Sequence, residues 1–310
     1  MIKQKTVFIL GAGASKPYGY PTGEELKKYI CNDIIHDSVD FFRYDRYSPY
    51  ITKSNELIQN FTKSTNKSID LFLTRNPQFE KLGKFFIAFS IMKSELESKS
   101  PDQIDNVEDW FSELFDRITD ELTEPNSVNN FLNNNFSFIT FNYDRSLEHF
   151  LFQALTNSYT NTNPKEIAKI LLKIPIVHVY GKLVDLPWEN SKTYLPYKEI
   201  NYNSVSQLAK NINVIYSNRI DEERIMKAKK LIKDADRIFF LGFGFASENM
   251  KILGIPDSLD RNKRIYATAY KNKDKEIQNL VSKFKNSKNE RIHNLNIMNY
   301  GSKELLRNFL

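Results

Sequence analysis

The chain alternates between short, continuous apolar runs and longer segments with a helical pattern. Six of the apolar runs are rich in strand-forming residues: TVFIL (6–10), FSFITF (136–141), IPIVHVY (174–180), DRIFFLGFGF (236–245), RIYATAY (264–270) and HNLNIMNY (293–300). The first of them, TVFIL, is continuously apolar, which is typical of a parallel strand buried on both faces.

Amphipathic segments separate these runs. A helix is expected to start at Thr22, because Glu25 three residues later completes a capping-box pattern. Strands that alternate with helices favour a parallel sheet covered on both faces. We therefore expect an α/β fold, a Rossmann-like doubly wound parallel sheet with a large helical insertion after the first βα unit. The chain would form a single domain with its core at 1–35 and 136–310 and the insertion at about 36–135.

Composition and charge restrict the class of protein. Of the 310 residues, 41% are hydrophobic and 26% are charged, as in ordinary soluble globular proteins. No apolar run approaches the roughly 18 residues that span a bilayer. The start, MIKQKTVFILGAGAS, resembles a signal peptide but has a short, glycine-interrupted apolar run. The net charge of +6 comes from lysines spread along the chain, so no specific nucleic-acid partner is expected.

Cysteine and histidine are scarce. Cys31 is the single cysteine, which excludes an internal disulfide and fits a reducing, cytoplasmic location. The four histidines are His36, His149, His178 and His293. Since no second histidine or cysteine stands at ligand spacing from His178, neither zinc nor another metal is expected.

A glycine-rich stretch, GAGAS at 11–15, follows the first expected strand directly. In a doubly wound sheet, ligands bind beyond the carboxyl ends of the strands, and glycines there let backbone N–H groups approach a pyrophosphate. Lys16 stands where the dinucleotide fingerprint has its third glycine, so the motif differs from that of ordinary dehydrogenases. The stretch indicates a nucleotide site, and the alternative is a tight strand-to-helix turn without a ligand.

Two further motifs follow the next strands. Asn142, Tyr143 and Asp144 come at the end of the second strand, where polar side chains face the ligand crevice. Alternatively, Asp144 is the N-cap of the next helix and Asn142 a turn residue. His178 ends the third strand just before Gly181, and a histidine there suits a general base whose pKa is near neutral pH. The alternative is a core histidine whose ring nitrogens are hydrogen-bonded.

A second glycine turn ends the fourth strand. Gly242, Phe243 and Gly244 are followed by Ser247 and Asn249. A glycine turn on the same edge of the sheet would close a ligand groove from the other side. In the simpler interpretation it is a strand-to-helix turn with Ser247 as the helix N-cap.

In this order, the four motifs resemble the sirtuin superfamily. The stretches FFLGFGFASENMKIL and SIDLFL are especially similar to bacterial sirtuin-like NADases that act as effectors in anti-phage defence. Sirtuin deacylases hold a structural zinc with two Cys-x-x-Cys pairs, which a chain with only Cys31 cannot build. The loop PYGYPTGEEL also lacks the Asp-Phe-Arg of the deacylases. Both departures argue against deacylation.

The resemblance implies that NAD is the substrate and is hydrolysed to nicotinamide and ADP-ribose, which depletes NAD in abortive infection. Asn142 would position the ribose and the attacking water, and Asp144 would contact the nicotinamide amide. His178 would act on a ribose hydroxyl as general base or orienter. The residues expected to bind NAD are Gly11, Ala12, Gly13, Ala14, Ser15, Thr22, Tyr143, Gly181, Gly242, Phe243, Gly244 and Asn249.

Other functions stay open: a sirtuin-type deacylase or ADP-ribosyltransferase, a non-catalytic sensor of NAD or ADP-ribose, and a structural subunit that binds no nucleotide. The resemblance also implies control by assembly into a homo-oligomer or by a separate ATPase or sensor protein. The candidate oligomer interface is an aromatic-rich helical region, and its alternative role is the core of the insertion. Its residues are Phe41, Phe42, Tyr44, Tyr47, Tyr50, Phe85, Phe86 and Phe89.

Overall fold

The computed structural model describes residues 1–43, 49–66, 68–104, 108–124, 127–190, 192–199, 204–214, 221–260, 262–284 and 294–310. Six strands form one parallel sheet in the order β3-β2-β1-β4-β5-β6. They are β1 (Thr6–Leu10), β2 (Phe136–Thr140), β3 (Ile176–His178), β4 (Arg237–Leu241), β5 (Arg264–Thr268) and β6 (Asn294–Met298). The predicted Rossmann-like α/β fold is confirmed.

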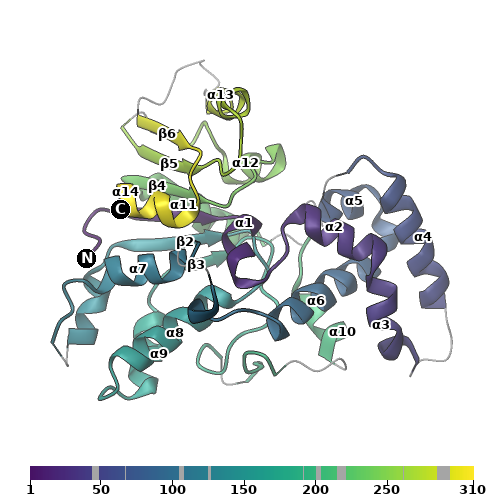
Figure 1. Cartoon of the computed structure of the whole chain (residues 1–310), viewed down its shortest axis with the longest axis horizontal. Coiled ribbons are helices and arrows are strands. Elements are labelled where there is room, and N and C mark those ends of the chain that lie inside the picture. Colours follow the sequence, from purple (N-terminus) through teal and green to yellow (C-terminus); the bar gives the residue numbers. More distant parts are fainter. Residues whose placement is uncertain are drawn as a thin grey trace.

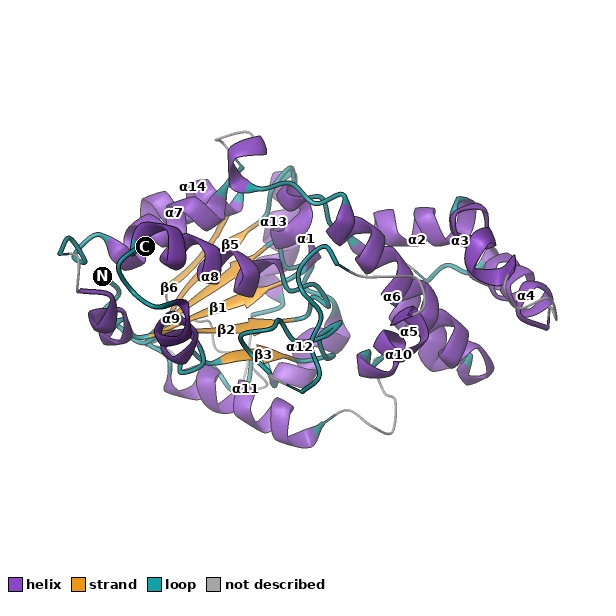
Figure 2. Ribbon diagram, turned by 90° about the horizontal axis from the view of Figure 1, so that it is seen from below, coloured by secondary structure: helices purple, strands orange, loops and turns teal. Residues whose placement is uncertain are grey.

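The helices of the described residues are α1 (Ala12–Ser15), α2 (Gly23–Asn32), α3 (Ile34–Arg43), α4 (Pro49–Lys63), α5 (Ile69–Arg75), α6 (Glu80–Leu96), α7 (Trp110–Thr119), α8 (Ser146–Ser158), α9 (Pro164–Leu171), α10 (Val205–Leu208), α11 (Glu222–Asp234), α12 (Ser247–Leu253), α13 (Asp274–Ser282) and α14 (Ser302–Phe309). Helices α7, α8 and α14 cover one face of the sheet, and α11 and α12 cover the other (Figure 2).

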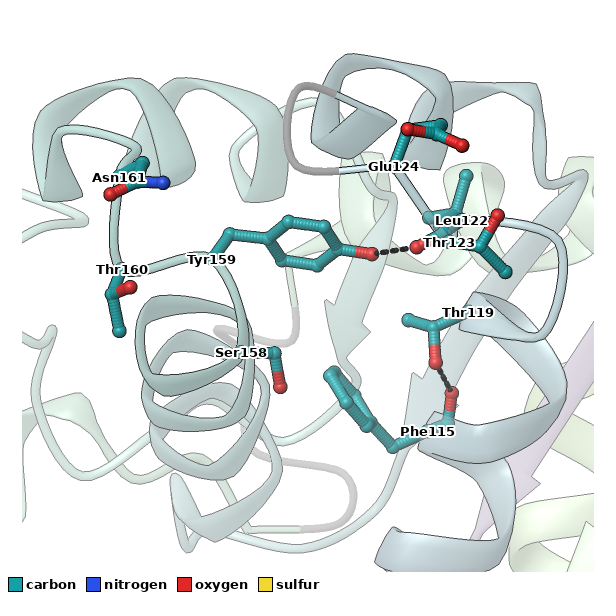
Figure 3. Close-up of a pocket in the computed structure, with 9 residues that line it drawn as sticks. All are labelled: Phe115, Thr119, Leu122, Thr123, Glu124, Ser158, Tyr159, Thr160 and Asn161. Carbon is teal, nitrogen blue, oxygen red and sulfur yellow. Dashed lines mark hydrogen bonds between the residues drawn. The ribbon is translucent and has the colours of Figure 1, made fainter.

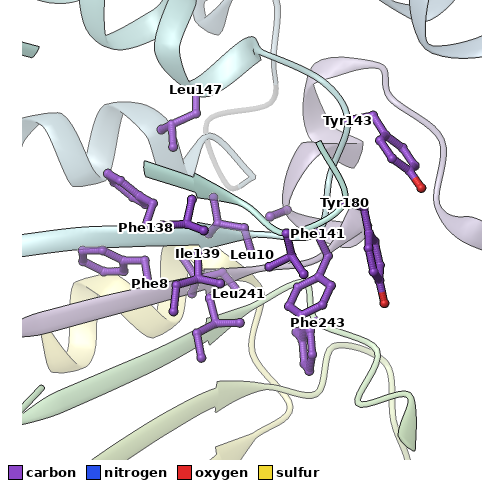
Figure 4. Close-up of a cluster of buried hydrophobic side chains, with 14 of the residues drawn as sticks. Phe8, Leu10, Phe138, Ile139, Phe141, Tyr143, Leu147, Tyr180, Leu241 and Phe243 are labelled. Carbon is purple, nitrogen blue, oxygen red and sulfur yellow. The ribbon is translucent and has the colours of Figure 1, made fainter. Parts of the chain in front are cut away.

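Burial explains the continuous apolar runs. Every residue of β1, β2 and β4 is buried, so these strands have no solvent face that would require polar side chains. Phe8 of β1 packs between Phe138 and Phe239 on the neighbouring strands, with ring centroids 5.3 and 5.5 Å away. Figure 4 shows this cluster continuing to the strand ends, where Phe141 and Phe243 pack together.

A helical lobe lies beside the carboxyl ends of the strands (Figure 1). Helices α2 to α6 pack against one another, and α10 packs on α6. Phe85, Phe86 and Phe89 of α6 are buried in this lobe, so they form its core and not an exposed interface. The side chains of Phe41, Phe42, Tyr44, Tyr47 and Tyr50 lie outside the described residues.

The lobe is smaller than the segment predicted for the insertion. Helix α7 falls within that segment, but it packs against α14 and α8 on the face of the sheet. Trp110 at its start is fully buried, and its indole Nε1 donates to the carbonyl of Ala14, 2.7 Å away. The amphipathic stripe of α7 therefore covers the sheet, and the lobe consists of α2 to α6 with α10.

Strand order determines where a ligand can approach. The chain runs outward from β1 to β3 on one side and from β4 to β6 on the other. The order therefore reverses between β1 and β4, and in open parallel sheets ligands bind at the carboxyl ends of the strands flanking such a point. The turn containing Gly11 follows β1, and the turn containing Gly242 follows β4.

Candidate functional site at the carboxyl ends of the strands

The two glycine turns touch at this point. The backbone N–H of Gly13 donates to the carbonyl of Gly242 at 3.0 Å. A Cβ on Gly11 would lie 2.6 Å from the oxygen of Gly242, and a Cβ on Gly242 would lie 2.0 Å from the nitrogen of Ala14. Gly242 also has a φ of +55°, which ends the predicted strand at Leu241. Contact between the turns alone thus requires glycine at these positions.

Asn142 joins the end of β2 to the first glycine turn. Its Nδ2 donates to the carbonyl of Gly11 at 3.0 Å and to Oγ of Ser15 at 2.9 Å. Both amide protons are therefore engaged, and no described residue donates to its Oδ1. The amide plane is fixed and its oxygen stays available as a hydrogen-bond acceptor.

Asp144 is buried in the same turn. Its Oδ1 accepts from the backbone N–H of Ser146 at 3.1 Å and from the hydroxyl of that serine. Asp144 therefore contacts the first residue of α8, but the N-cap of that helix is Arg145, so the prediction that Asp144 is the N-cap is wrong. Burial raises the pKa of Asp144, although hydrogen bonds from Ser146 and Ser15 oppose the shift.

His178 at the end of β3 is buried, and both of its ring nitrogens have partners. Nδ1 lies 3.0 Å from the backbone carbonyl of Asn142, and Nε2 lies 2.6 Å from Oε1 of Glu148 on α8. Lys182 approaches the same carboxylate oxygen at 3.6 Å. Sequence reasoning missed Glu148, which stands 30 residues from its partner and within an apolar helical stripe.

Tyr143 and Arg145, which flank Asp144 in the sequence, face the helical lobe. The hydroxyl of Tyr143 donates to Oδ1 of Asp70 on α5 at 2.6 Å. Arg145 and Glu95 of α6 form an ion pair in which neither side chain is exposed, with Nη2–Oε1 at 2.7 Å. Arg145 also donates to backbone carbonyls between 185 and 196. This segment thus connects the sheet to the lobe through buried polar contacts.

Other predicted residues have structural roles. Thr22 and Glu25 form the predicted capping box at the start of α2. Gly181 has a φ of +89°, and a Cβ there would lie 2.1 Å from the carbonyl of Asn211. Asn249 accepts from the hydroxyl of Tyr180 at 2.6 Å.

The predicted residues around the second glycine turn have different surroundings in the structure. Phe243 is buried between Phe141 and Phe240. A Cβ on Gly244 would meet nothing within 4 Å, unlike one on Gly242. Ser247 begins α12 but is not its N-cap, a position held by Ala246, so that prediction is wrong.

The polar residues at the strand ends enclose a small cavity. It is lined by Leu10, Ser15, Trp110, Phe111, Thr140, Asn142, Asp144, Leu147, Glu148 and His178. Its volume of about 10 Å³ is close to the minimum that holds one water molecule. Pockets for small molecules usually measure some 300–1,000 Å³, so a nucleotide needs the elements around this cavity to move apart.

A larger pocket of about 440 Å³ lies elsewhere, between the C-terminal ends of α7 and α8 (Figure 3). It is lined by Phe115, Thr119, Leu122, Thr123, Glu124, Ser158, Tyr159, Thr160 and Asn161. None of the predicted site residues is among them. The hydroxyl of Tyr159 donates to the carbonyl of Leu122 across its wall.

Searches for metal-binding groups and for membrane-spanning helices in the described residues, and for related sequences, all gave negative results. The described residues contain no group of three or more His, Cys, Asp or Glu side chains able to hold a metal ion. No helix in the described part of the chain is long and apolar enough to cross a membrane. The chain matches no protein-family model, and no curated protein matches its sequence.

Proposed function

We propose that the protein binds NAD at the carboxyl ends of β1, β2 and β4 and hydrolyses its nicotinamide–ribose bond. The observation that carries the proposal is the environment of Asn142, whose amide is fixed by Gly11 and Ser15 at the point where the strand order reverses. Parallel sheets of this order bind dinucleotides at that point. The order of motifs, which resembles that of sirtuin-like NADases, supports NAD as the dinucleotide.

The chemistry makes modest demands on the protein. Cleavage passes through an oxocarbenium-like state, as in glycoside hydrolysis, and nicotinamide leaves as a neutral group that needs no general acid. The site must hold the ribose and direct one water at its anomeric carbon. The free Oδ1 of Asn142 is suited to accept a hydrogen bond from that water, because both amide protons are already engaged. No metal is part of the proposed reaction.

A second candidate function is binding of NAD or ADP-ribose without turnover. One observation favours it: both ring nitrogens of His178 are hydrogen-bonded within the protein. The cavity beside Asn142, with a volume of about 10 Å³, must open for either function. In the proposed hydrolase the same features describe a resting state that opens before NAD enters. A regulator, either a second copy of this chain or a separate ATPase or sensor protein, would then favour the open form.

The testing experiment measures NAD consumption and NAD binding by the purified full-length chain. Asn142→Ala is expected to lower turnover by about 100- to 1,000-fold, the usual cost of losing one oriented polar group at a reacting centre. Asn161→Ala is the matched control, because Asn161 is exposed and lines the larger pocket. Equal turnover in Asn142→Ala and wild type would overturn the proposal.

The binding arm tests both candidates. Binding of NAD that Asn142→Ala weakens, with no nicotinamide released, would fit both the non-catalytic function and a hydrolase that needs its regulator. Absence of NAD and ADP-ribose binding would exclude both. Release of nicotinamide only in the presence of an acylated peptide or an acceptor protein would instead indicate a deacylase or ADP-ribosyltransferase.

The biological role follows from the reaction. An enzyme that hydrolyses NAD without a second substrate depletes the cytoplasmic pool, which is the outcome expected of an effector in anti-phage abortive infection. Expression of the chain should lower cellular NAD and stop growth, whereas Asn142→Ala should be tolerated. Unchanged NAD during expression and phage challenge would contradict this role.

A further inference from the structure

Five residues beside the proposed site form a continuous hydrogen-bonded series through side chains and backbone carbonyls. Glu148 on α8 contacts His178 at the end of β3, and His178 contacts the carbonyl of Asn142 after β2. The side chain of Asn142 in turn contacts Gly11 and Ser15 after β1. Each step joins a different element of the fold. Displacement of Glu148 would therefore change the hydrogen bonds at the first glycine turn.

The partners of His178 define its chemical state. A carbonyl oxygen and a carboxylate oxygen are both acceptors, at 3.0 Å from Nδ1 and 2.6 Å from Nε2. A neutral imidazole has one N–H and one acceptor nitrogen, whereas an imidazolium has two N–H donors. An ionised Glu148 therefore requires the imidazolium, which has no lone pair left to accept a proton from substrate.

Neighbouring charges favour an ionised Glu148. Burial alone would raise the pKa of Glu148, but the charges of His178 and Lys182 and the hydrogen bond from His178 hold it at about 2. Lys182 is paired in turn with Glu189 at 2.6 Å and with Asp185 at 3.1 Å. Lys182 is thus matched by surrounding carboxylates, as a buried charge requires.

We propose that Glu148 is a positioning residue which, as an ionised pair with His178, fixes the carbonyl of Asn142, so that His178 serves the site as a hydrogen-bond donor and not as a general base. The expected effect on kcat rests on the proposed NAD hydrolysis. The protonation of His178 and its dependence on Glu148 can be tested with or without turnover. Asp144 is a further titratable group in this turn, and the charge of Glu148 contributes to raising the pKa of Asp144.

The first test is NMR of the full-length protein labelled with ¹⁵N in its histidine rings, recorded at the pH of the NAD assay. Loss of signals in His178→Asn identifies the ring. Both nitrogens of His178 are expected to show protonated-type shifts in the wild type. A single unprotonated nitrogen in the wild type would overturn the proposal, whether or not the protein consumes NAD.

The second test uses two matched variants. Glu148→Gln removes the charge but preserves the shape, so one ring nitrogen of His178 is expected to lose its proton. Glu189→Gln removes a carboxylate that contacts Lys182, and it should leave both signals unchanged. If Glu148→Gln does not fold, the wild-type spectrum and Glu189→Gln still decide the protonation state. A folded Glu148→Gln variant with both nitrogens protonated would contradict the dependence on Glu148.

The third test is the pH profile of turnover. A histidine acting as general base produces a tenfold fall in rate per pH unit below its titration, near pH 6.5 for an ordinary histidine. The donor role predicts no such fall between pH 7.5 and 5.5. Glu148→Gln should lower kcat by about ten- to a hundredfold through misplacement of Asn142, with KM for NAD changed less than kcat. An acid limb that His178→Asn abolishes would instead establish the base.

Absence of turnover in every variant would overturn the proposed hydrolysis alone. The NMR result would still confirm or reject the ionised pair. Failure of the proposed function and failure of this inference are thus distinguishable.

Discussion

The segment from Asn142 to Glu148 has two sides, and they differ in how completely their polar groups are paired. Toward the lobe, Tyr143 donates to Asp70, and Arg145 pairs with Glu95 while donating to three backbone carbonyls. Toward the glycine turns, Oδ1 of Asn142 has no donor among the described residues.

This difference distinguishes polar groups that stabilise the fold from polar groups that can bind a ligand. A buried group whose hydrogen bonds are all satisfied within the protein has nothing left to offer a ligand. A buried group held rigidly by some of its atoms, with one polar atom free, is ready to bind a water or a substrate. We therefore assign the lobe-facing side to stability and the other side to function, although both belong to one short turn.

The largest expected loss of stability comes from breaking the buried ion pair on the lobe-facing side. Arg145→Met leaves Glu95 buried without its cation, and breaking a buried pair in this way costs about 3–5 kcal/mol of unfolding free energy. Urea unfolding measures it. Lys169→Met is the control, because its pair with Glu166 is exposed and worth less than about 1 kcal/mol. The double variant Arg145→Met/Glu95→Leu should recover much of the loss, and equal stability of Arg145→Met and wild type would refute the assignment.

The second prediction concerns the side that faces the glycine turns and the pH dependence of its stability. The pKa of Glu148 is lowered from 4.5 to about 2, so its contribution is complete above pH 4.5 and is lost as pH falls toward 2. Glu148→Gln should therefore be less stable than wild type by about 3 kcal/mol at pH 7, and the difference should shrink between pH 5 and 3. Unfolding curves across that range measure the difference.

Glu189→Gln is the control of opposite sign. Burial, with the charge of Glu148, raises the pKa of Glu189, so ionised Glu189 weakens the fold as pH rises. Replacing it should leave stability unchanged at low pH and improve it relative to wild type at higher pH. Parallel pH curves for both glutamine variants would contradict the distinction between the two carboxyls.

The glycine contact gives the third prediction. Gly242→Ala places a Cβ 2.0 Å from the nitrogen of Ala14 on a backbone with φ of +55°, so a loss of about 1–3 kcal/mol is expected. Gly244→Ala is the matched control, since its Cβ meets nothing within 4 Å, and it should change stability by less than about 0.5 kcal/mol. Thermal unfolding compares the two, and equal losses would show that the close approach of the turns does not matter.

The sequence predicted the framework well, because its signals are local. Apolar runs identified the six strands, and Thr22 with Glu25 identified the start of α2. Glu148 was missed because its contact with His178 depends on how α8 docks on the sheet. Gly11 was expected to let backbone N–H groups approach a pyrophosphate, and the turn at Gly242 was expected to close the groove from the other side. In the structure their lack of side chains lets the two turns touch.

The smallest expected effect concerns Thr22, which the sequence assigned both to a helix cap and to the NAD site. Its hydroxyl accepts from the N–H of Glu25, and that carboxylate accepts from the N–H of Thr22 at 2.9 Å. Thr22→Ala should therefore cost about 1 kcal/mol, and Thr22→Ser, which keeps the hydroxyl, should cost less. NAD affinity of both variants should stay within twofold of wild type. If Thr22→Ala instead weakens NAD binding more than tenfold at unchanged stability, the threonine hydroxyl contacts the ligand, and the functional side of the molecule extends to the start of α2.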